Sequence, residues 1–317
     1  MIRFAVIGAG NVARRFCESL SHHPEACLYA IYGRNIQKLE VFRKMFPCEK
    51  VYTDLDEVLS DENVDAVYVS LPNSLHRNAS LKAMKKGIPV LCEKPAVLSS
   101  EDMKEIMDLS KEKDVLFMEA LKTRFSPLYR KVRKMVKKGV IGEVKSVDTE
   151  LFFAGNRETM IIDAKEGGIL PGCGVYGMSV MIDLLEGVRP AVVFLDNDPC
   201  LETSARVFFL NDKEYPSILA TGIREARSSE AVIKGEKGSI RIPDFHRAQK
   251  ACLITEDEET EISVPFEVDD FYDEIDHFVT LVKEGKRESY IVPLSDSMKL
   301  VRLVEEIRAL SPKKTEL

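Results

Sequence analysis

The stretch Ile2-Arg3-Phe4-Ala5-Val6-Ile7-Gly8-Ala9-Gly10-Asn11-Val12-Ala13 decides the fold of this chain. Residues 2–7 alternate into an apolar strand, and the turn G-x-G-x-x-A that follows leads into a helix. Gly8 permits the tight turn, Gly10 lets the backbone approach a phosphate, and Ala13 lets the helix pack closely on the strand. Because N–H groups at a helix start bind anions, this turn predicts a dinucleotide-binding site. Its predicted cofactor-binding residues are Gly8, Gly10, Asn11 and Val12.

The first third of the chain alternates strands with helices. Strands are predicted at 2–7, 28–32, 65–70, 88–92 and 115–118, and helices at 11–21, 35–46, 55–60, 74–86 and 101–112. The apolar run that ends at Pro72 is typical of a buried parallel strand. This alternation predicts an α/β protein whose N-terminal domain, residues 1–122, is a Rossmann doubly wound parallel sheet.

The remainder, residues 123–317, has a different pattern. Further strands are predicted at 143–153, 192–195, 204–210, 216–223, 229–234, 238–242, 251–255 and 261–264, joined by short turns. Helices are predicted at 174–186 and 269–284 on one face, and a last helix at 295–310 either stays in this domain or returns to the first. We therefore expect a C-terminal α+β domain with a largely antiparallel open sheet for substrate binding and oligomerisation.

Composition excludes several classes of protein. The formal net charge of −7 argues against a nucleic-acid partner, which requires a basic face. The seven cysteines are scattered without a C-x-x-C pair, which is typical of a reducing compartment and predicts no metal site. No apolar run reaches membrane-spanning length and the N-terminus is a strand, so we expect a cytoplasmic protein without membrane partners.

Further motifs follow in a set order. They are Ser70-Leu71-Pro72-Asn73-Ser74-Leu75-His76, Val90-Leu91-Cys92-Glu93-Lys94-Pro95, Met118-Glu119-Ala120 with Arg124-Phe125-Ser126-Pro127, and Gly167-Gly168-Ile169-Leu170-Pro171-Gly172-Cys173-Gly174-Val175-Tyr176. Together with the N-terminal turn, this order resembles the Gfo/Idh/MocA family of NAD(P)-dependent oxidoreductases over essentially the whole chain. Within the family it is most similar to the dihydrodiol and xylose dehydrogenases, which have a tyrosine where inositol dehydrogenases have a histidine.

In a doubly wound sheet, ligands bind at the carboxyl ends of the strands. The loops at these ends therefore converge on one crevice, and they contain the further cofactor-binding candidates Gly33, Arg34, Ser70, Leu71, Pro72, Asn73, His76, Glu93 and Lys94. The resemblance also implies that the Lys94-Pro95 peptide bond is cis.

The residues after the second strand bear on the choice of cofactor. Gly33-Arg34-Asn35 contains no acid that could accept the ribose 2′-hydroxyl of NAD. Arg34 can bind a 2′-phosphate, and Lys38, four residues on, is expected on the same helix face. The sequence thus predicts a preference for NADP(H), with NAD(H) possible; the alternative is that both are ordinary solvated charges.

Two residues are candidates for catalysis. Lys94 would stabilise negative charge on the oxygen of a carbonyl that accepts hydride, and the alternative is a surface lysine. Tyr176 would exchange the proton with the substrate, and a nearby cation such as Lys94 would lower the pKa of its phenol. The alternative for Tyr176 is a core tyrosine with a satisfied hydroxyl.

The chain departs from the resembled family at one position. Gly172 stands where the family pattern has an aspartate that helps to orient the substrate or the proton donor. Asp163 or Glu166 could supply a carboxylate instead.

Several other candidates keep two interpretations. His76 lies near the nicotinamide ribose or merely in a first helical turn, and Glu93 binds ribose hydroxyls or pairs with a lysine. Arg124 anchors substrate or cofactor, or forms an inter-domain ion pair. Arg157 is a further candidate for substrate contact.

These residues predict an NADP(H)-preferring dehydrogenase or reductase of a sugar, polyol or related carbonyl compound. A nucleotide-binding regulatory or sensor protein on the same scaffold is the alternative, because Gly172 replaces the family aspartate. A homodimer or larger homo-oligomer is expected through the open sheet face, to which we assign Val207, Phe209, Ile218 and Ala220.

Overall fold

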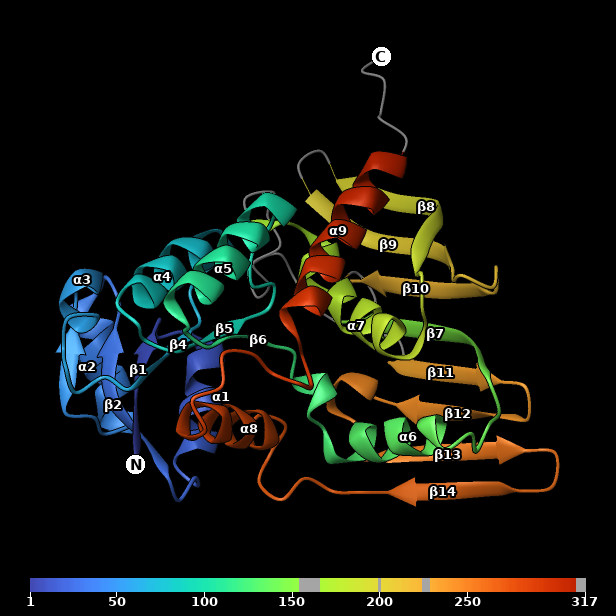
Figure 1. The fold of residues 1–317 in the computed structure, drawn as a ribbon, viewed down its shortest axis with the longest axis horizontal. Helices are drawn as coiled ribbons and strands as arrows, with labels where there is room; N and C mark the ends of the chain where they lie inside the picture. The colour runs from blue at the N-terminus through green and yellow to red at the C-terminus, as the bar shows by residue number, and fades with distance from the viewer. Residues whose placement is uncertain (154–165, 199–200, 224–228, 312–317) are drawn as a thin grey trace, which may run out of the picture. The chain divides into compact units, whose positions relative to one another are not determined.

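The computed structural model describes residues 1–153, 166–198, 201–223 and 229–311. The chain divides into two compact units, each with its own sheet (Figure 1). The first unit contains Met1–Lys122 and Glu267–Met298, and the second contains Thr123–Phe266 and Lys299–Leu317. Helix α9 (Leu294–Leu310) contains the last junction between the two.

The first unit is built on a six-stranded parallel sheet in the order β3-β2-β1-β4-β5-β6. Its strands are β1 (Ile2–Ile7), β2 (Ala26–Tyr32), β3 (Lys50–Tyr52), β4 (Ala66–Val69), β5 (Val90–Glu93) and β6 (Phe117–Ala120). Its first helices are α1 (Asn11–Leu20), α2 (Ile36–Met45), α3 (Leu55–Val58), α4 (Asn73–Lys85) and α5 (Ser100–Lys113). The predicted Rossmann sheet is confirmed, and the short edge strand β3 is an addition that the sequence patterns did not reveal.

Helix α8 (Tyr272–Lys283) also belongs to the first unit. The sequence pattern predicts this apolar helix on the second sheet, but it packs beside α1. The ring centroids of Phe4 and Phe278 lie 5.8 Å apart, and both side chains are fully buried. Periodicity revealed the apolar stripe of this helix but could not show which sheet buries it.

The second unit holds an eight-stranded sheet in the order β14-β13-β12-β11-β7-β10-β9-β8. Its strands are β7 (Val144–Phe152), β8 (Arg189–Asp198), β9 (Leu201–Leu210), β10 (Pro216–Gly222), β11 (Glu230–Gly235), β12 (Gly238–Pro243), β13 (Lys250–Thr255) and β14 (Glu259–Ser263). Every pairing is antiparallel except that of β10 with β7. The expected, largely antiparallel sheet is therefore confirmed.

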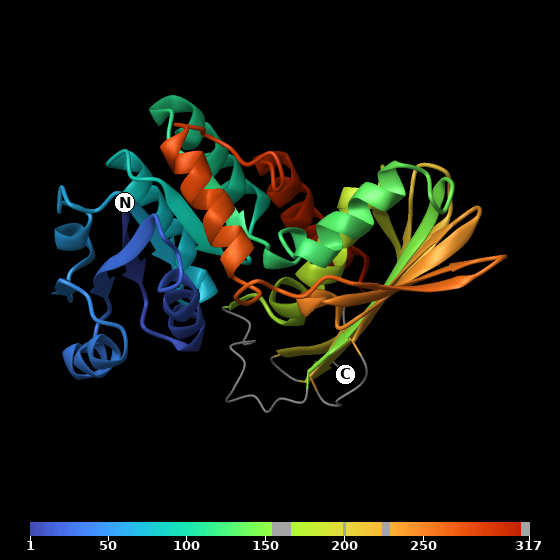
Figure 2. The same ribbon diagram turned by 90° about the horizontal axis from the view of Figure 1, so that it is seen from below.

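Helices α6 (Pro127–Lys137) and α7 (Val175–Leu184) lie over one face of this sheet (Figures 1 and 2). Helix α6 was not among the predicted elements, although Pro127 at its first position is a start signal. A Cβ on Gly177 would lie 2.3 Å from Oγ1 of Thr149, so α7 approaches β7 very closely.

The residues expected on the open sheet face were partly wrong. Val207 and Phe209 are buried on the face that α7 covers, 0% and 1% exposed, whereas Ile218 pairs with Phe208 on the opposite face. Side chains alternate along a strand, so a set that mixes odd and even positions of β9 and β10 cannot share one face. Ile218 and Ala220 do lie on the open face, together with Val192 and Phe194, which have 48% and 59% of their surface exposed.

Two further observations concern the whole described chain. Within its described ranges, no helix is long and apolar enough to cross a membrane. The six described cysteines are all free thiols, and Cys200 lies outside the described residues.

Candidate active site

The turn between β1 and α1 has the geometry of a phosphate cradle. Gly8 has φ +119°, which L-residues with a side chain rarely adopt. A Cβ on Gly10 would meet no atom within 4 Å, so the space beside it is open. Within the described residues, no side chain caps the start of α1, and Asn11 and Val12 are exposed there. The N–H groups of this helix terminus thus suit the pyrophosphate of a dinucleotide.

The carboxyl end of β2 presents Gly33, Arg34 and Asn35. Asn35 caps α2 by accepting a 2.9 Å hydrogen bond from the N–H of Lys38. The side chains of Arg34 and Lys38 are both exposed. Because α2 begins at Ile36, Arg34 precedes the helix, and the expected helical spacing between Arg34 and Lys38 is wrong.

His76 joins the loops after β4 and β5. Its ring is 1% exposed and lies in the first turn of α4. Its Nδ1 is 2.8 Å from the carbonyl oxygen of Pro95, and its Nε2 is 2.7 Å from that of Leu71. Since carbonyl oxygens only accept hydrogen bonds, the ring donates to both only when both nitrogens carry protons. His76 therefore fixes Ser70–Asn73 against Glu93–Pro95 inside the first unit.

Glu93 is fixed by a buried tyrosine. Its Oε1 accepts a 2.5 Å hydrogen bond from Tyr68, whose ring stacks on Phe16 at 3.7 Å. Burial is the main cause that raises the pKa of Tyr68 well above its usual range, and the Glu93 charge adds to it. This contact ties the end of β5 to β4, and Oε2 of Glu93 accepts a 3.2 Å hydrogen bond from the N–H of Lys94.

Lys94 is half-buried at the end of β5, and its peptide bond to Pro95 is cis, as the resemblance implied. The fully buried Glu119 accepts a 2.9 Å hydrogen bond from the N–H of Ala96. Burial raises the pKa of Glu119, whereas that hydrogen bond and the positive charge of Lys94 oppose the rise. The Lys94 ammonium therefore acts electrostatically on the interior of the first unit.

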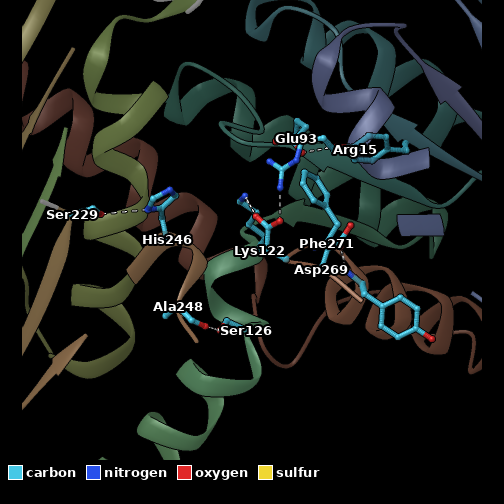
Figure 3. A network of polar contacts seen from close by, with 12 residues as sticks. Arg15, Glu93, Lys122, Ser126, Ser229, His246, Ala248, Asp269 and Phe271 are labelled. Atoms are coloured by element: carbon cyan, nitrogen blue, oxygen red, sulfur yellow. Dashed lines mark hydrogen bonds and ion pairs between the residues drawn. The ribbon is translucent and has the colours of Figure 1, made fainter. Parts of the chain in front are cut away.

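An ionic cluster that no sequence motif indicated joins α1 to a buried carboxylate. Arg15 and Lys122 both donate to the carboxylate of Asp270, whose side chain is 4% exposed. The ring of Phe271 lies 4.6 Å from Cζ of Arg15 and 5.0 Å from Nζ of Lys122 (Figure 3). This cluster connects α1, the end of β6 and the segment before α8 within the first unit.

In the second unit, Tyr176 lies in the first turn of α7 and is 9% exposed. The preceding residues Leu170–Gly174 form a π-helical turn that contains Gly172. Such turns are rare and frequent at functional sites. The buried Glu166 precedes this turn, and Asp163 lies outside the described residues.

Arg124 is buried in an ion pair inside the second unit. Its Nη1 lies 2.7 Å from Oδ1 of Asp183, and both side chains are almost inaccessible. Tyr129 and Arg133 also donate to Asp183, at 2.7 and 2.8 Å. Both partners of this ion pair fold in the same unit. Arg157 lies outside the described residues.

His246 is a candidate that the sequence analysis missed. Its ring centroid lies 6.2 Å from that of Tyr176 and 5.5 Å from that of Phe153. No motif indicated this residue, because it comes from a turn 70 positions after Tyr176 in the printed sequence. Within the described residues, no group of three metal-ligating side chains converges.

The fold and the β1–α1 cradle define a dinucleotide-binding protein, and comparison with known proteins gives the family. Residues 2–121 match the family model described as an oxidoreductase family with an NAD-binding Rossmann fold. Residues 133–314 match the model for the C-terminal alpha/beta domain of that oxidoreductase family. The chain belongs to the Gfo/Idh/MocA family and is an NAD(P)-dependent oxidoreductase.

Two relatives in sequence match nearly the whole chain. An NADP(+)-dependent scyllo-inositol 2-dehydrogenase of Bacillus subtilis is 28% identical, covering 97% of this chain and 96% of its own. A trans-1,2-dihydrobenzene-1,2-diol dehydrogenase of Xenopus laevis is 27% identical, covering 96% of each chain.

A solved structure shares the fold of both units. A 3-ketoreductase from Actinomadura kijaniata, in complex with NADP and TDP-benzene, superposes with a TM-score of 0.88. It is 24% identical, and the match covers 97% of each chain. At that identity, the likeness shows the fold alone.

Proposed function

We propose that this protein is an NADP(H)-preferring oxidoreductase that transfers a hydride between nicotinamide and a sugar, polyol or related carbonyl compound. The observation that carries the proposal is the position of Lys94. This residue is half-buried at the end of β5, and His76 joins the loop after β5 to the loop after β4. The named activities of the inositol and dihydrodiol dehydrogenases support the substrate class.

The proposed cofactor contacts lie at the carboxyl edge of the first sheet. Gly8, Gly10, Asn11 and Val12 receive the pyrophosphate, and the two loops that His76 joins receive the nicotinamide half. The exposed Arg34 binds the 2′-phosphate through charge-assisted hydrogen bonds, and Lys38 adds a second positive charge. When bound, the nicotinamide ring supplies or accepts the hydride.

Lys94 is proposed to stabilise charge on the oxygen bound to the reacting carbon. As a carbonyl is reduced, negative charge develops on that oxygen, and the ammonium of Lys94 stabilises it. The Glu93 carboxylate accepts a 3.2 Å hydrogen bond from the N–H of Lys94 and so holds the Lys94 backbone in place before the reaction. Such preorganised charge acts mainly in the transition state and therefore raises kcat.

Tyr176 is the proposed proton donor and acceptor. Its phenol donates a proton to the same oxygen in reduction and accepts it in oxidation. The π-helical turn before α7 sets the direction of the first helical turn, in which Tyr176 lies. Lys94 and Tyr176 together complete the transfer without a metal ion in the proposed scheme.

The experiment is a panel of carbonyl compounds tested with NADPH, and of polyols tested with NADP+. We expect oxidation of NADPH by at least one keto-inositol, ketose, aldose or diketone. Tight NADPH binding, measured by fluorescence, without turnover across the panel would contradict the enzyme and favour a nucleotide-binding sensor. The observation that favours the sensor is Gly172, which stands in the place of the family aspartate.

The open face of the second sheet is the proposed homo-oligomer interface. Val192 and Phe194 expose 48% and 59% of their surface on it, and Phe194 meets Phe208 edge to face at 6.4 Å. Exposed aromatic and aliphatic residues that adjoin one another are typical of an association surface. A second copy of the chain is the proposed occupant.

A further inference from the structure

The turn that carries His246 is held firmly at both ends. The 3-10 turn Phe245–Arg247 connects β12 with β13. Its first residue, Phe245, is 2% exposed, and Ala248, which follows the turn, is 1% exposed. The N–H of Asp244 donates a 2.7 Å hydrogen bond to the carbonyl oxygen of Ser229. Ser126 donates a 3.0 Å hydrogen bond to the carbonyl oxygen of Ala248 (Figure 3). The backbone at His246 therefore has little freedom to move.

The ring of His246 is also oriented. Its Nδ1 lies 3.3 Å from the hydroxyl oxygen of Ser229, a residue that is only 8% exposed (Figure 3). Phe153 meets the ring edge to face, with an interplanar angle of 79°. With Nδ1 held by Ser229, the second nitrogen, Nε2, lies on the edge of the ring that is turned away from that hydroxyl.

The oriented ring lies beside the proposed proton donor. The ring centroids of His246 and Tyr176 are 6.2 Å apart, tilted by 53°. His246 is half-buried, so solvent-sized molecules reach it, whereas Tyr176 is almost enclosed. A small molecule whose oxygen contacts the Tyr176 hydroxyl therefore lies close to the imidazole of His246.

The proposed substrate class requires polar groups besides Tyr176 in the site. A sugar or polyol has several hydroxyl groups besides the reacting one, and a site that binds them requires polar partners. A glycine offers no side chain where the resembled family has an aspartate. An imidazole can donate or accept a hydrogen bond and so can serve a hydroxyl in either direction.

We propose that His246 binds a substrate hydroxyl through Nε2, with Ser229 as the positioning residue that holds its ring. This assignment rests on the proposed function, because it takes Tyr176 as the group that meets the reacting oxygen. It makes His246 a determinant of specificity for polyhydroxylated substrates.

Four variants test the assignment with the best substrate of the panel. In His246→Ala, we expect KM to rise about 10–100-fold with kcat within about 3-fold, as for a lost hydrogen bond of about 1.4–2.8 kcal/mol. His246→Gln places an amide near the position of Nε2 and should recover most of the lost affinity. His246→Asn places its amide near Nδ1 and should not. Ser229→Ala should raise KM less than His246→Ala does.

Two readouts separate this proposal from the proposed function. The Kd of NADPH, from its fluorescence, should stay within about 2-fold in every variant, and His22→Ala, on the surface of the first unit, is the matched control. Unchanged KM in His246→Ala, or recovery by Asn equal to that by Gln, would overturn the role of His246 alone. A wild-type protein that turns over no panel compound would overturn both this assignment and the proposed function.

Discussion

A Cβ atom on Gly8 would lie 2.8 Å from the main-chain oxygen of Ser70. The turn after β1 therefore touches the end of β4, and the two cofactor loops of the first unit share one tight contact. Gly10, two residues later, has open space around its Cβ direction. The two glycines thus have separable roles, one in the fold and one in ligand approach.

We predict that Gly8→Ala destabilises the protein by about 1–3 kcal/mol, because of its φ of +119° and the Ser70 contact. Gly10→Ala should leave the free energy of unfolding nearly unchanged but weaken NADPH binding about 10-fold or more, since the methyl group occupies the phosphate space. Urea unfolding and NADPH fluorescence measure the two effects. Equal destabilisation by both substitutions would contradict this division.

Lys94→Ala should lower kcat by about 10²–10³-fold, since it removes the cation that stabilises the oxyanion. Binding of NADPH should change far less, because the charge acts mainly in the transition state. Steady-state kinetics and cofactor fluorescence separate the two. Tyr176→Phe should likewise keep cofactor binding and slow turnover. Near-normal kcat in Lys94→Ala would show that this lysine is a surface charge.

Arg34→Ala should weaken NADPH binding about 10–100-fold while NADH binding changes by less than about 2-fold. The difference arises because only NADPH carries the 2′-phosphate that the guanidinium binds. Lys86→Ala, an exposed lysine beyond the far end of α4, is the control for a loss of general positive charge. Equal Kd values of the two cofactors in the unmodified protein would refute the NADP(H) preference.

Glu274 predicts a pH dependence of stability. It is 1% exposed in α8, and burial raises its pKa well above 4.5. The folded state then binds more protons than the unfolded state, so this group lowers the free energy of unfolding as pH rises above 4.5. The slope is about 1.4 kcal/mol per pH unit until the raised pKa is passed.

Glu274→Gln keeps the shape of the side chain without an ionisable proton. We expect the variant to gain stability relative to the wild type between about pH 5 and about pH 8, measured by urea unfolding. Glu62→Gln, on the exposed surface of the same unit, is the control. A stability difference between wild type and Glu274→Gln that is independent of pH would show that Glu274 is ionised in the folded protein.

Light scattering should find a homodimer or larger assembly at micromolar concentration. Phe194→Glu should shift it toward the monomer, because it places a charge in the centre of the exposed apolar residues of β8 and β9. Val41→Glu substitutes a similarly exposed residue of α2, 54% accessible, and should leave the assembly intact. If the wild-type protein is a monomer, the open sheet face is not an oligomer interface.

Much of the first unit follows from the sequence because its signals are local. The turn Gly8–Ala13, the apolar runs of β4 and β5 and the caps of the helices are all contained within a few residues. The order strand, turn, helix also fixes which loops lie at the carboxyl edge, so Lys94, Glu93 and Arg34 could be named before any coordinates. The helical spacing expected between Arg34 and Lys38 was wrong, because α2 begins at Ile36.

The tertiary structure alone decided the contacts between distant segments. Arg15 and Asp270 are 255 residues apart, Lys122 and Asp270 are 148 apart, and α8 packs beside α1. His246 lies beside Tyr176 because a turn between β12 and β13 places it there, and no local pattern marks that turn as functional. Hydrophobic periodicity indicates that a side chain is buried but not which partner buries it. The sequence by itself therefore determined the helices, the strands and the turn Gly8–Ala13. The partner of each apolar stripe and the position of His246 beside Tyr176 depend on long-range packing, which only the folded chain defines.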